Sequence, residues 1–479
     1  MKRAILLCLL GSLLPFSARG ADPELTAEVQ AGLSKAVKFF RTQVAVEGGC
    51  LWRYRADLER GEGERQAGKR TVWIQPPGTP SVGLAYLEVF RLTGDRAYLD
   101  AARETANGLA RGQLRSGGWD YLIEFEPDAR KRYAYRLDPP REGKLRNTTT
   151  LDDNTTQESL RCLMQVDQAL EFKDPTIHDA AEYALAALLK AQYPNGAWPQ
   201  RYSEFPDPEK FPVRRASYPE SWSREYEGDK YYTHYTLNDN TLADTIDTML
   251  LAADIYNEAK YRQAALRGGE FILLAQLPEP QPAWAQQYDS EMHPAWARKF
   301  EPPSVTGGES QGIMQLLLEL YRRTGERKFL DPVPRALAYL KKSQLADGRL
   351  ARFYELKTNR PLYFTRQYEL TYDDGDLPTH YGFKVSSKLD RIARDYERLK
   401  DADPAELAKP RTPGRIKMST GLAREAREVL DAMDDRGVWV EQGELRAYDD
   451  DNAREIIDVK TYSQRIVTLA RYLSAARSE

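Results

Sequence analysis

Cysteine and histidine are scarce in this sequence of 479 residues, which contains three cysteines and four histidines. Only Cys50 and Cys162 lie beyond the first twenty residues, so at most one disulfide can form. That number excludes a small fold held together by a disulfide framework. The histidines are scattered along the chain and lack the ligand spacing of a zinc site.

An excess of positive charge is also missing. The chain has 69 basic and 72 acidic residues, which gives a net charge of −3, and no basic run stands out. Nucleic-acid-binding surfaces need such a run or patch, so we expect no nucleic-acid partner. A polyanionic substrate would instead need cations gathered at its own binding site.

Long hydrophobic runs are absent beyond the N-terminus. Two basic residues precede a short apolar stretch at residues 4–16, and the small residues Ala18 and Gly20 form a cleavage-site pattern. The stretch is shorter than the ~20 residues of a membrane-spanning helix. We therefore expect residues 1–20 to be a signal peptide, and the mature chain to be periplasmic or secreted, without membrane contact. An uncleaved membrane anchor is the alternative.

Four stretches of the chain show apolar residues at helical spacing after an N-cap residue, and they begin near residues 79, 153, 238 and 308. Each leads through a polar turn to a second helix and then to a turn with Gly or Pro, usually with an aromatic residue. One helical pair cannot bury its apolar face alone, whereas stacked pairs can. We expect a mainly α fold, a closed or partly closed (α/α) toroid of repeated helical pairs with an irregular, loop-rich cleft. An irregular helical array is the alternative.

Two polar insertions, at residues 124–150 and 204–229, interrupt this rhythm. We expect residues 21–383 to form the toroidal catalytic domain. The weaker helical patterns of residues 384–479, which surround a proline-rich break, indicate a small C-terminal subdomain that packs on the N-terminal helices.

The same tripeptide, Asp-Asn-Thr, stands at two successive helix starts. The first copy includes Asp153 and Asn154, and the second includes Asp239. Equivalent positions of a toroid face one mouth, where carboxylate and amide oxygens suit a hard cation such as calcium, or sugar hydroxyls. A helix N-cap is the alternative role for each aspartate.

Aromatic and basic residues follow in the next unit. Trp284 offers a flat face for a sugar ring, and Arg298 and Lys299 are adjacent cations. Four arginines within residues 349–366 could clamp carboxylates bidentately. A surface arginine paired with Glu301, and a solvated edge hairpin, are the alternatives.

Several motifs in this order resemble the family 10 polysaccharide lyases, which are pectate lyases of helical toroid type. The matching segments span about residues 33–383 and read TGDRAYLDAA, LDDNTTQ, PNGAWPQRY, YTLNDNT, AWAQQYD, ARKFEPPSVTGGES and RFYELKTNRPLYF. The resemblance implies calcium-assisted β-elimination of α-1,4-linked polygalacturonate, in which an arginine removes the C5 proton.

By that resemblance Arg298 is the base, and Asp153 and Asp239 are calcium ligands. The substrate contacts that we expect are spread over the matching motifs and comprise Asn154, Arg201, Trp284, Lys299, Arg360 and Arg366. The chain departs from the family pattern at residues 372–383, where His380 and acidic residues replace a cation. We expect His380 to replace that substrate contact, and loss of the contact is the alternative.

The function that we expect is an exported pectate lyase that needs Ca2+, binds acidic polysaccharide and acts as a monomer. A toroidal glycoside hydrolase, with a carboxylate pair drawn from Asp153, Asp239 and Glu309, is the enzymatic alternative. A glycan-binding protein without activity is the other alternative.

Overall fold

The computed structural model describes residues 22–228, 231–407 and 414–477. The expected signal peptide lies outside these residues. Part of the expected proline-rich break also lies outside them. Most of the described chain is helical, in the following elements: α1 (Pro23–Phe39), α2 (Thr79–Thr93), α3 (Arg96–Arg111), α4 (Pro127–Arg130), α5 (Thr155–Ala169), α6 (Pro175–Ala191), α7 (Thr241–Tyr256), α8 (Ala259–Ala275), α9 (Glu309–Thr324), α10 (Val333–Lys342), α11 (Leu389–Lys400), α12 (Pro404–Leu407), α13 (Thr420–Asp431) and α14 (Val459–Ala476).

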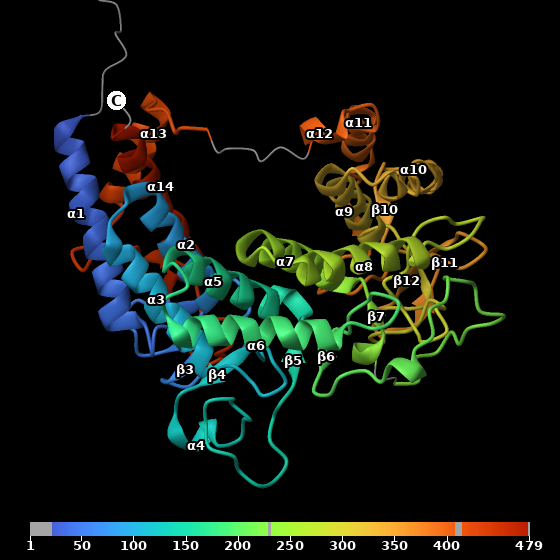
Figure 1. Cartoon of the computed structure of the whole chain (residues 1–479), viewed down its shortest axis with the longest axis horizontal. Helices are drawn as coiled ribbons and strands as arrows, with labels where there is room; N and C mark the ends of the chain where they lie inside the picture. Colours follow the sequence, from blue (N-terminus) through green and yellow to red (C-terminus); the bar gives the residue numbers. More distant parts are fainter. Residues whose placement is uncertain (1–21, 229–230, 408–413, 478–479) are drawn as a thin grey trace, which may run out of the picture.

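The helices pack as consecutive pairs in one curved row. The pairs are α2–α3, α5–α6, α7–α8 and α9–α10, and each pair contacts the next. Figure 1 shows the row as an open arc that runs from α1 and α14 at one end to α9–α11 at the other. This arrangement confirms the mainly α class and the partly closed toroid of helical pairs. An irregular array is thereby excluded for the described residues.

The polar turns between paired helices have a local cause. Gly94 ends α2 with a left-handed φ of 70°, and Asp95 then caps α3 by accepting the Ala97 amide at 3.0 Å. Gly325 ends α9 with the same φ. A left-handed C-cap costs glycine little, and a side-chain cap satisfies a free helix N–H. Short tight turns follow, and the paired helices become antiparallel.

Short strands join the ends of the helices. The elements that form four-stranded sheets are, in order, β15 (Glu441–Gln442), β16 (Glu455–Asp458), β1 (Arg53–Arg55) and β2 (Gly61–Glu62), and then β13 (Leu370–Thr371), β12 (Pro361–Phe364), β11 (Phe353–Glu355) and β9 (Ser304–Thr306). Two-stranded ribbons pair β3 (Thr71–Trp73) with β4 (Leu122–Glu124), β5 (Thr149–Thr150) with β6 (Arg201–Tyr202), β7 (Tyr235–Thr236) with β8 (Gln287–Tyr288), and β10 (Leu350–Ala351) with β14 (Lys384–Val385). All of these pairings are antiparallel.

The tryptophan of each aromatic turn is part of the core. Trp119, Trp198 and Trp284 are all fully buried, and each indole N–H donates at 2.9 Å to a carbonyl of the preceding helix. A buried indole needs such a partner. The expectation that Trp284 stacks on a sugar is therefore wrong, because its ring has no exposed face.

The C-terminal residues attach to both ends of the arc. Helix α11 contacts α9 and α10, whereas α14 lies between α1 and α2 and also contacts α13. Buried residues of α11 and α14 belong to the same hydrophobic core as those of α1 and α2. The domain boundary at residue 383 stays a prediction.

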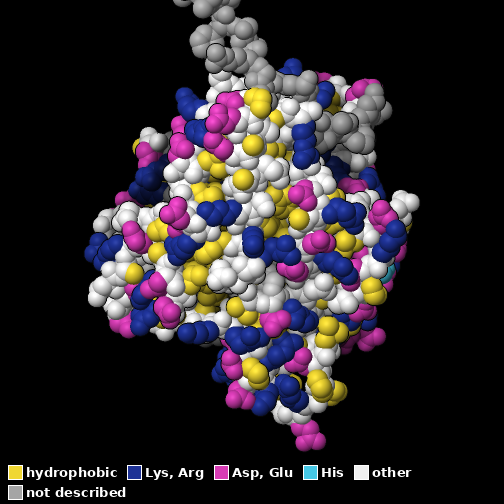
Figure 2. All heavy atoms as spheres, turned by 90° about the vertical axis from the view of Figure 1, so that its left-hand side faces the viewer, with side chains coloured by type: hydrophobic (Ala, Val, Ile, Leu, Met, Phe, Trp, Pro, Cys, Tyr) yellow, Lys and Arg dark blue, Asp and Glu magenta, His cyan; other side chains and the backbone are white. Residues whose placement is uncertain are grey.

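The surface at the α1 and α14 end is mixed in charge. Figure 2 looks onto this end and shows basic and acidic side chains interspersed, with a projecting lobe below. The lobe contains α4 and belongs to the first predicted insertion (Figure 1). No helix in the described ranges combines the length and the apolarity that a membrane crossing requires.

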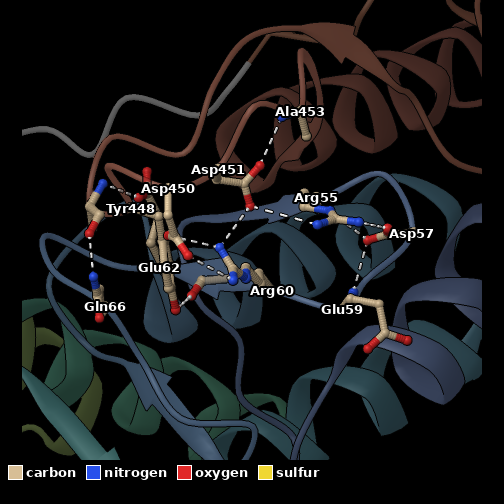
Figure 3. A network of polar contacts seen from close by, with 12 residues as sticks. Arg55, Asp57, Glu59, Arg60, Glu62, Gln66, Tyr448, Asp450, Asp451 and Ala453 are labelled. Atoms are coloured by element: carbon tan, nitrogen blue, oxygen red, sulfur yellow. Dashed lines mark hydrogen bonds and ion pairs between the residues drawn. The ribbon is translucent and has the colours of Figure 1, made fainter.

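A polar network joins the β1–β2 hairpin to the loop before β16. Glu62 is 1 % exposed and accepts the backbone amides of Arg446 and Ala447 at 3.1 and 2.7 Å. Arg60 reaches Asp450 and Asp451 of the same loop (Figure 3). The buried carboxylate thus holds the C-terminal strands against the N-terminal hairpin.

We expect Glu62→Ala to lower the free energy of unfolding by about 3 kcal/mol, because it leaves two partly buried backbone amides and Arg53 without their acceptor. Denaturant unfolding followed by circular dichroism measures the change. Glu59→Ala is the control, since Glu59 is solvent-exposed, and its change should stay within about 0.5 kcal/mol. Equal changes in both variants would contradict this role of Glu62.

Candidate active site

Two turns of identical shape precede α5 and α7. Asp153 and Asp239 both have φ 49° and ψ 34°, and Asn154 and Asn240 follow with φ 60° and 56°. Left-handed geometry costs about 1–2 kcal/mol for a residue with a side chain. Aspartate and asparagine tolerate it best. Strain of this kind, stored twice in one place, is typical of functional sites.

The ribbons β5–β6 and β7–β8 set the position of these turns. The amide of Leu151 donates to Gln200 O at 2.8 Å, and the amide of Leu237 donates to Gln286 O at 2.9 Å. The 3-10 turns η2 (Asp152–Asn154) and η5 (Asn238–Asn240) then contact each other directly. Two repeats of the toroid therefore present their aspartates at one point.

Three carboxylates meet at this point. Oxygen atoms of Asp152, Asp153 and Asp239 all lie within 4.8 Å of one another. The pKa of Asp153 rises to about 6 and that of Asp239 to about 7. Burial is the main cause and the charge of Asp152 adds to it, whereas Arg298 opposes both. Full ionisation of the three carboxylates is unfavourable, so a bound cation would stabilise their charged forms. Carboxylate oxygens are ligands that suit calcium.

Each carboxylate has a dedicated polar partner. Gln75 Nε2 donates to Asp153 Oδ2 at 2.8 Å, and Asn238 Nδ2 donates to Asp239 Oδ2 at 2.8 Å. Asp152 accepts three hydrogen bonds, from the side chains of Tyr121 at 2.7 Å, Gln200 at 3.0 Å and Arg201 at 3.1 Å. These donors orient the carboxylates, so the cluster is built before any ligand arrives.

Arg298 lies at the edge of the cluster. Its Nη2 is 3.2 Å from Asp239 Oδ2, and its Nε is 3.6 Å from the buried Glu301 Oε2. Tyr381 holds the other oxygen of Glu301 at 2.9 Å. Burial lowers the pKa of Arg298, but Glu301 and Asp239 outweigh it and raise the pKa above its usual value. The expected alternative, a pair with Glu301, is present together with the contact to Asp239.

The other expected substrate cations are arranged around this centre in different ways. Arg201 bonds to Asp152, as described above. Lys299 Nζ lies 3.5 Å from the centre of the Tyr368 ring. The His380 ring packs edge-on against the ring of Phe300, two residues after Arg298, with 5.3 Å between the ring centres. Both residues thus belong to an aromatic cluster beside the Arg298 turn.

Arg360 and Arg366 flank strand β12. The Arg360 guanidinium covers the Tyr372 ring at 3.4 Å, and Arg366 Nε lies 3.2 Å from Asp376 with two thirds of its side chain exposed. In the described chain neither arginine contacts the three aspartates. Their substrate role stays a prediction.

The side chain of Asn154 is held by two neighbours in α5, and its contact with substrate stays a prediction. Its amide nitrogen donates to Glu158 at 2.8 Å, and its amide oxygen accepts a hydrogen bond from Arg161. Both ends of the side chain are therefore engaged within α5. These two contacts tie the strained turn to the helix that follows it.

Sequence reasoning missed Asp152 and Tyr121. Asp152 precedes Asp153, but the second repeat has Asn238 at the equivalent position, so a comparison of the repeats hides it. Tyr121 belongs to the first aromatic turn, which the sequence pattern identifies, but its hydrogen-bond partner Asp152 is 31 residues away in the chain. Only the folded arrangement brings the two together.

Comparisons with known proteins agree with the motifs. Residues 128–349 match the family model described as pectic acid lyase. A variant of the family 10 polysaccharide lyase from Cellvibrio cellulosa, in complex with trigalaturonic acid, is 19 % identical over 67 % of this chain and 98 % of its own, with a TM-score of 0.46. Another structure of the family 10 polysaccharide lyase from Cellvibrio cellulosa is 20 % identical over 67 % of this chain and 97 % of its own, with a TM-score of 0.45.

Cellobiose 2-epimerase from Bacillus thermoamylovorans is 11 % identical over 94 % of this chain and 99 % of its own, with a TM-score of 0.44. No curated protein matches the sequence significantly. Residues 128–349 are thus similar to the pectic acid lyase family, which agrees with the resemblance that the motifs indicated.

Proposed function

We propose that this lyase cleaves α-1,4-linked polygalacturonate by β-elimination, with calcium at the aspartates and Arg298 as the base. The observation that carries the proposal is the 3.2 Å contact between Arg298 Nη2 and Asp239 Oδ2. Base and metal ligands must act on the same sugar unit, so they must share one centre. The contact supports such a centre.

Calcium would be held by Asp153 and Asp239, and Asp152 provides a third carboxylate within 4.8 Å. Among the described residues, Arg201 pairs with Asp152 and Arg298 pairs with Asp239, so the three carboxylates keep negative charge that a divalent ion would neutralise. When bound there beside a uronate carboxylate, calcium supplies Lewis acidity that makes the proton on C5 easier to remove.

Arg298 takes the C5 proton in its neutral form. The C–H electron pair becomes the C4–C5 double bond, the C4–O4 bond breaks, and O4 takes a proton from water. Arginine is ordinarily protonated, and here Glu301 and Asp239 hold it so against the effect of burial. Once the charge of Asp239 is engaged by a cation, one of these two partners is lost and burial favours the neutral form.

The geometry does not favour a glycoside hydrolase. Asp153 and Asp239 belong to one cluster of three carboxylates in which Arg298 contacts Asp239 at 3.2 Å, whereas the acid–base pair of a hydrolase consists of two carboxyl groups and uses no guanidinium. Glu309, the third candidate, pairs with Arg352 at 3.2 Å. No comparable acid–base pair arises from these three residues.

Export belongs to the same proposal. Residues 1–20 have the pattern of a signal peptide, and an acidic polysaccharide is an extracellular or periplasmic substrate. N-terminal sequencing of the protein purified from its native host tests this directly, since export predicts a mature chain that begins at Ala21.

We expect Arg298→Lys to lower kcat on polygalacturonate by at least about 100-fold, because the lysine ammonium cannot reproduce the position of the guanidinium. Absorbance of the unsaturated product measures the rate, and calorimetry should show pectate affinity within about threefold of wild type. Arg398→Lys, at an exposed arginine of α11 paired with Asp395, is the control. Full activity of Arg298→Lys would refute the assignment of the base.

Asp153→Ala should raise the calcium concentration for half-maximal activity by at least about tenfold, since it removes one anionic ligand. Titration of calcium into the chelator-treated enzyme gives this value. Asp128→Ala, at a 90 % exposed carboxylate of α4, is the control. A calcium requirement that Asp153→Ala leaves unchanged would count against the site.

Calcium affinity should rise with pH between about 5 and 8. The pKa values of about 6 for Asp153 and about 7 for Asp239 mean that protons compete with calcium over this window. Calorimetry in buffers of different ionisation enthalpy should detect protons released on binding, more at pH 6 than at pH 8. A flat affinity over the window would show that these carboxylates are not the ligands.

A further inference from the structure

A cavity of about 740 Å³ lies beside Arg201 and is called here the Arg201 cavity. It is lined by residues 201–207, by Lys210 and Phe211, and by Tyr232. Its volume falls within the ~300–1,000 Å³ of ligand-binding cavities. Arg201 also donates to Asp152 at 3.1 Å, so the cavity adjoins the carboxylate cluster.

The lining of the Arg201 cavity is rich in aromatic rings that face solvent. Phe205 is 44 % exposed and Tyr232 is 37 % exposed. The described chain has six large apolar side chains that are more than a third exposed, and two of them, Phe205 and Tyr232, line this cavity. Exposed apolar groups concentrated in this way mark a binding surface. Flat rings suit the C–H faces of pyranose units.

The charges of the cavity are already matched. The Nη2 of Arg201 donates to Tyr121 and Asp152, and Lys210 Nζ lies 3.4 Å from Asp207 Oδ2. Glu204 lines the cavity without an ion-pair partner among the described residues. The cavity therefore offers no unpaired cation and one unpaired carboxylate, which repels a second carboxylate nearby.

We propose that the Arg201 cavity binds an uncharged sugar unit of the polymer, namely a methyl-esterified galacturonosyl unit. This rests on the proposed function, because it places that unit on the same chain as the free uronate at the carboxylate cluster. The ester removes the repulsion from Glu204, and its methyl group meets the aromatic lining. The enzyme then selects partly esterified pectin over fully acidic pectate.

Binding of hexasaccharides to Arg298→Lys tests this without turnover. We expect hexagalacturonate that carries methyl esters to bind at least about fivefold tighter than the fully acidic hexamer. Glu204→Gln, added to Arg298→Lys, should reduce that preference by at least about threefold through tighter binding of the acidic hexamer. Glu209→Gln is the matched control, since Glu209 lies five residues later, is exposed and does not line the cavity.

Tyr232→Ala provides a second variant. It should weaken binding of the esterified hexamer by at least about fivefold and leave trigalacturonate binding unchanged. Phe172→Ala, at a ring that is also 44 % exposed but lies elsewhere, should change neither. Circular dichroism checks that each variant is folded.

Equal affinities for the two hexamers, or an ester preference that survives Glu204→Gln unchanged, would overturn the assignment of the cavity. The outcome is separable from that of the proposed function. A wild-type enzyme that forms unsaturated product without any ester preference contradicts the cavity alone. A protein that forms no such product but keeps the preference, and loses it in Glu204→Gln, contradicts the elimination and supports the cavity.

Discussion

Mutual repulsion among three carboxylates is the constraint on which the centre of this protein depends. Asp152, Asp153 and Asp239 lie within 4.8 Å of one another and are partly shielded from water. Such an arrangement persists only if the surrounding structure fixes it and if positive charge is supplied. Arg201 pairs with Asp152 and Arg298 pairs with Asp239, and these two arginines supply part of that positive charge. The negative charge that remains accounts for the raised pKa values of Asp153 and Asp239 and is the reason for proposing a divalent cation there.

The toroid provides the rigidity that this cluster requires. Three of the repeats end in a buried tryptophan that bonds to its own helix pair, and after Trp119 and Trp198 a ribbon leads into a strained turn. Two such turns meet because α5 and α7 are neighbours in the row. A small shift of one repeat would separate Asp153 from Asp239. The core packing and the chemistry are therefore coupled, although the residues that pack and the residues that react are different.

The sequence predicts the repeated parts well and the long-range parts poorly. Helical periodicity and caps at Gly94 and Asp95 identify the helical pairs, because these signals are local. The twin Asp-Asn-Thr starts identify Asp153 and Asp239 for the same reason. The prediction for Trp284 is wrong because a tryptophan in such a turn can equally belong to the core or bind a sugar ring. Its zero exposure in the fold assigns it to the core. Asp152 escaped notice because its importance comes from Tyr121 and Arg201, which are distant in the chain.

A crystal structure of Arg298→Lys with calcium and trigalacturonate tests the central claim most directly. The account predicts one calcium ion with oxygen ligands at about 2.3–2.6 Å that include Asp153, Asp239 and a uronate carboxylate. It also predicts that the side chain at position 298 points at C5 of the same sugar. A calcium ion bound away from these aspartates, or a sugar whose C5 lies on the far side from position 298, would contradict it.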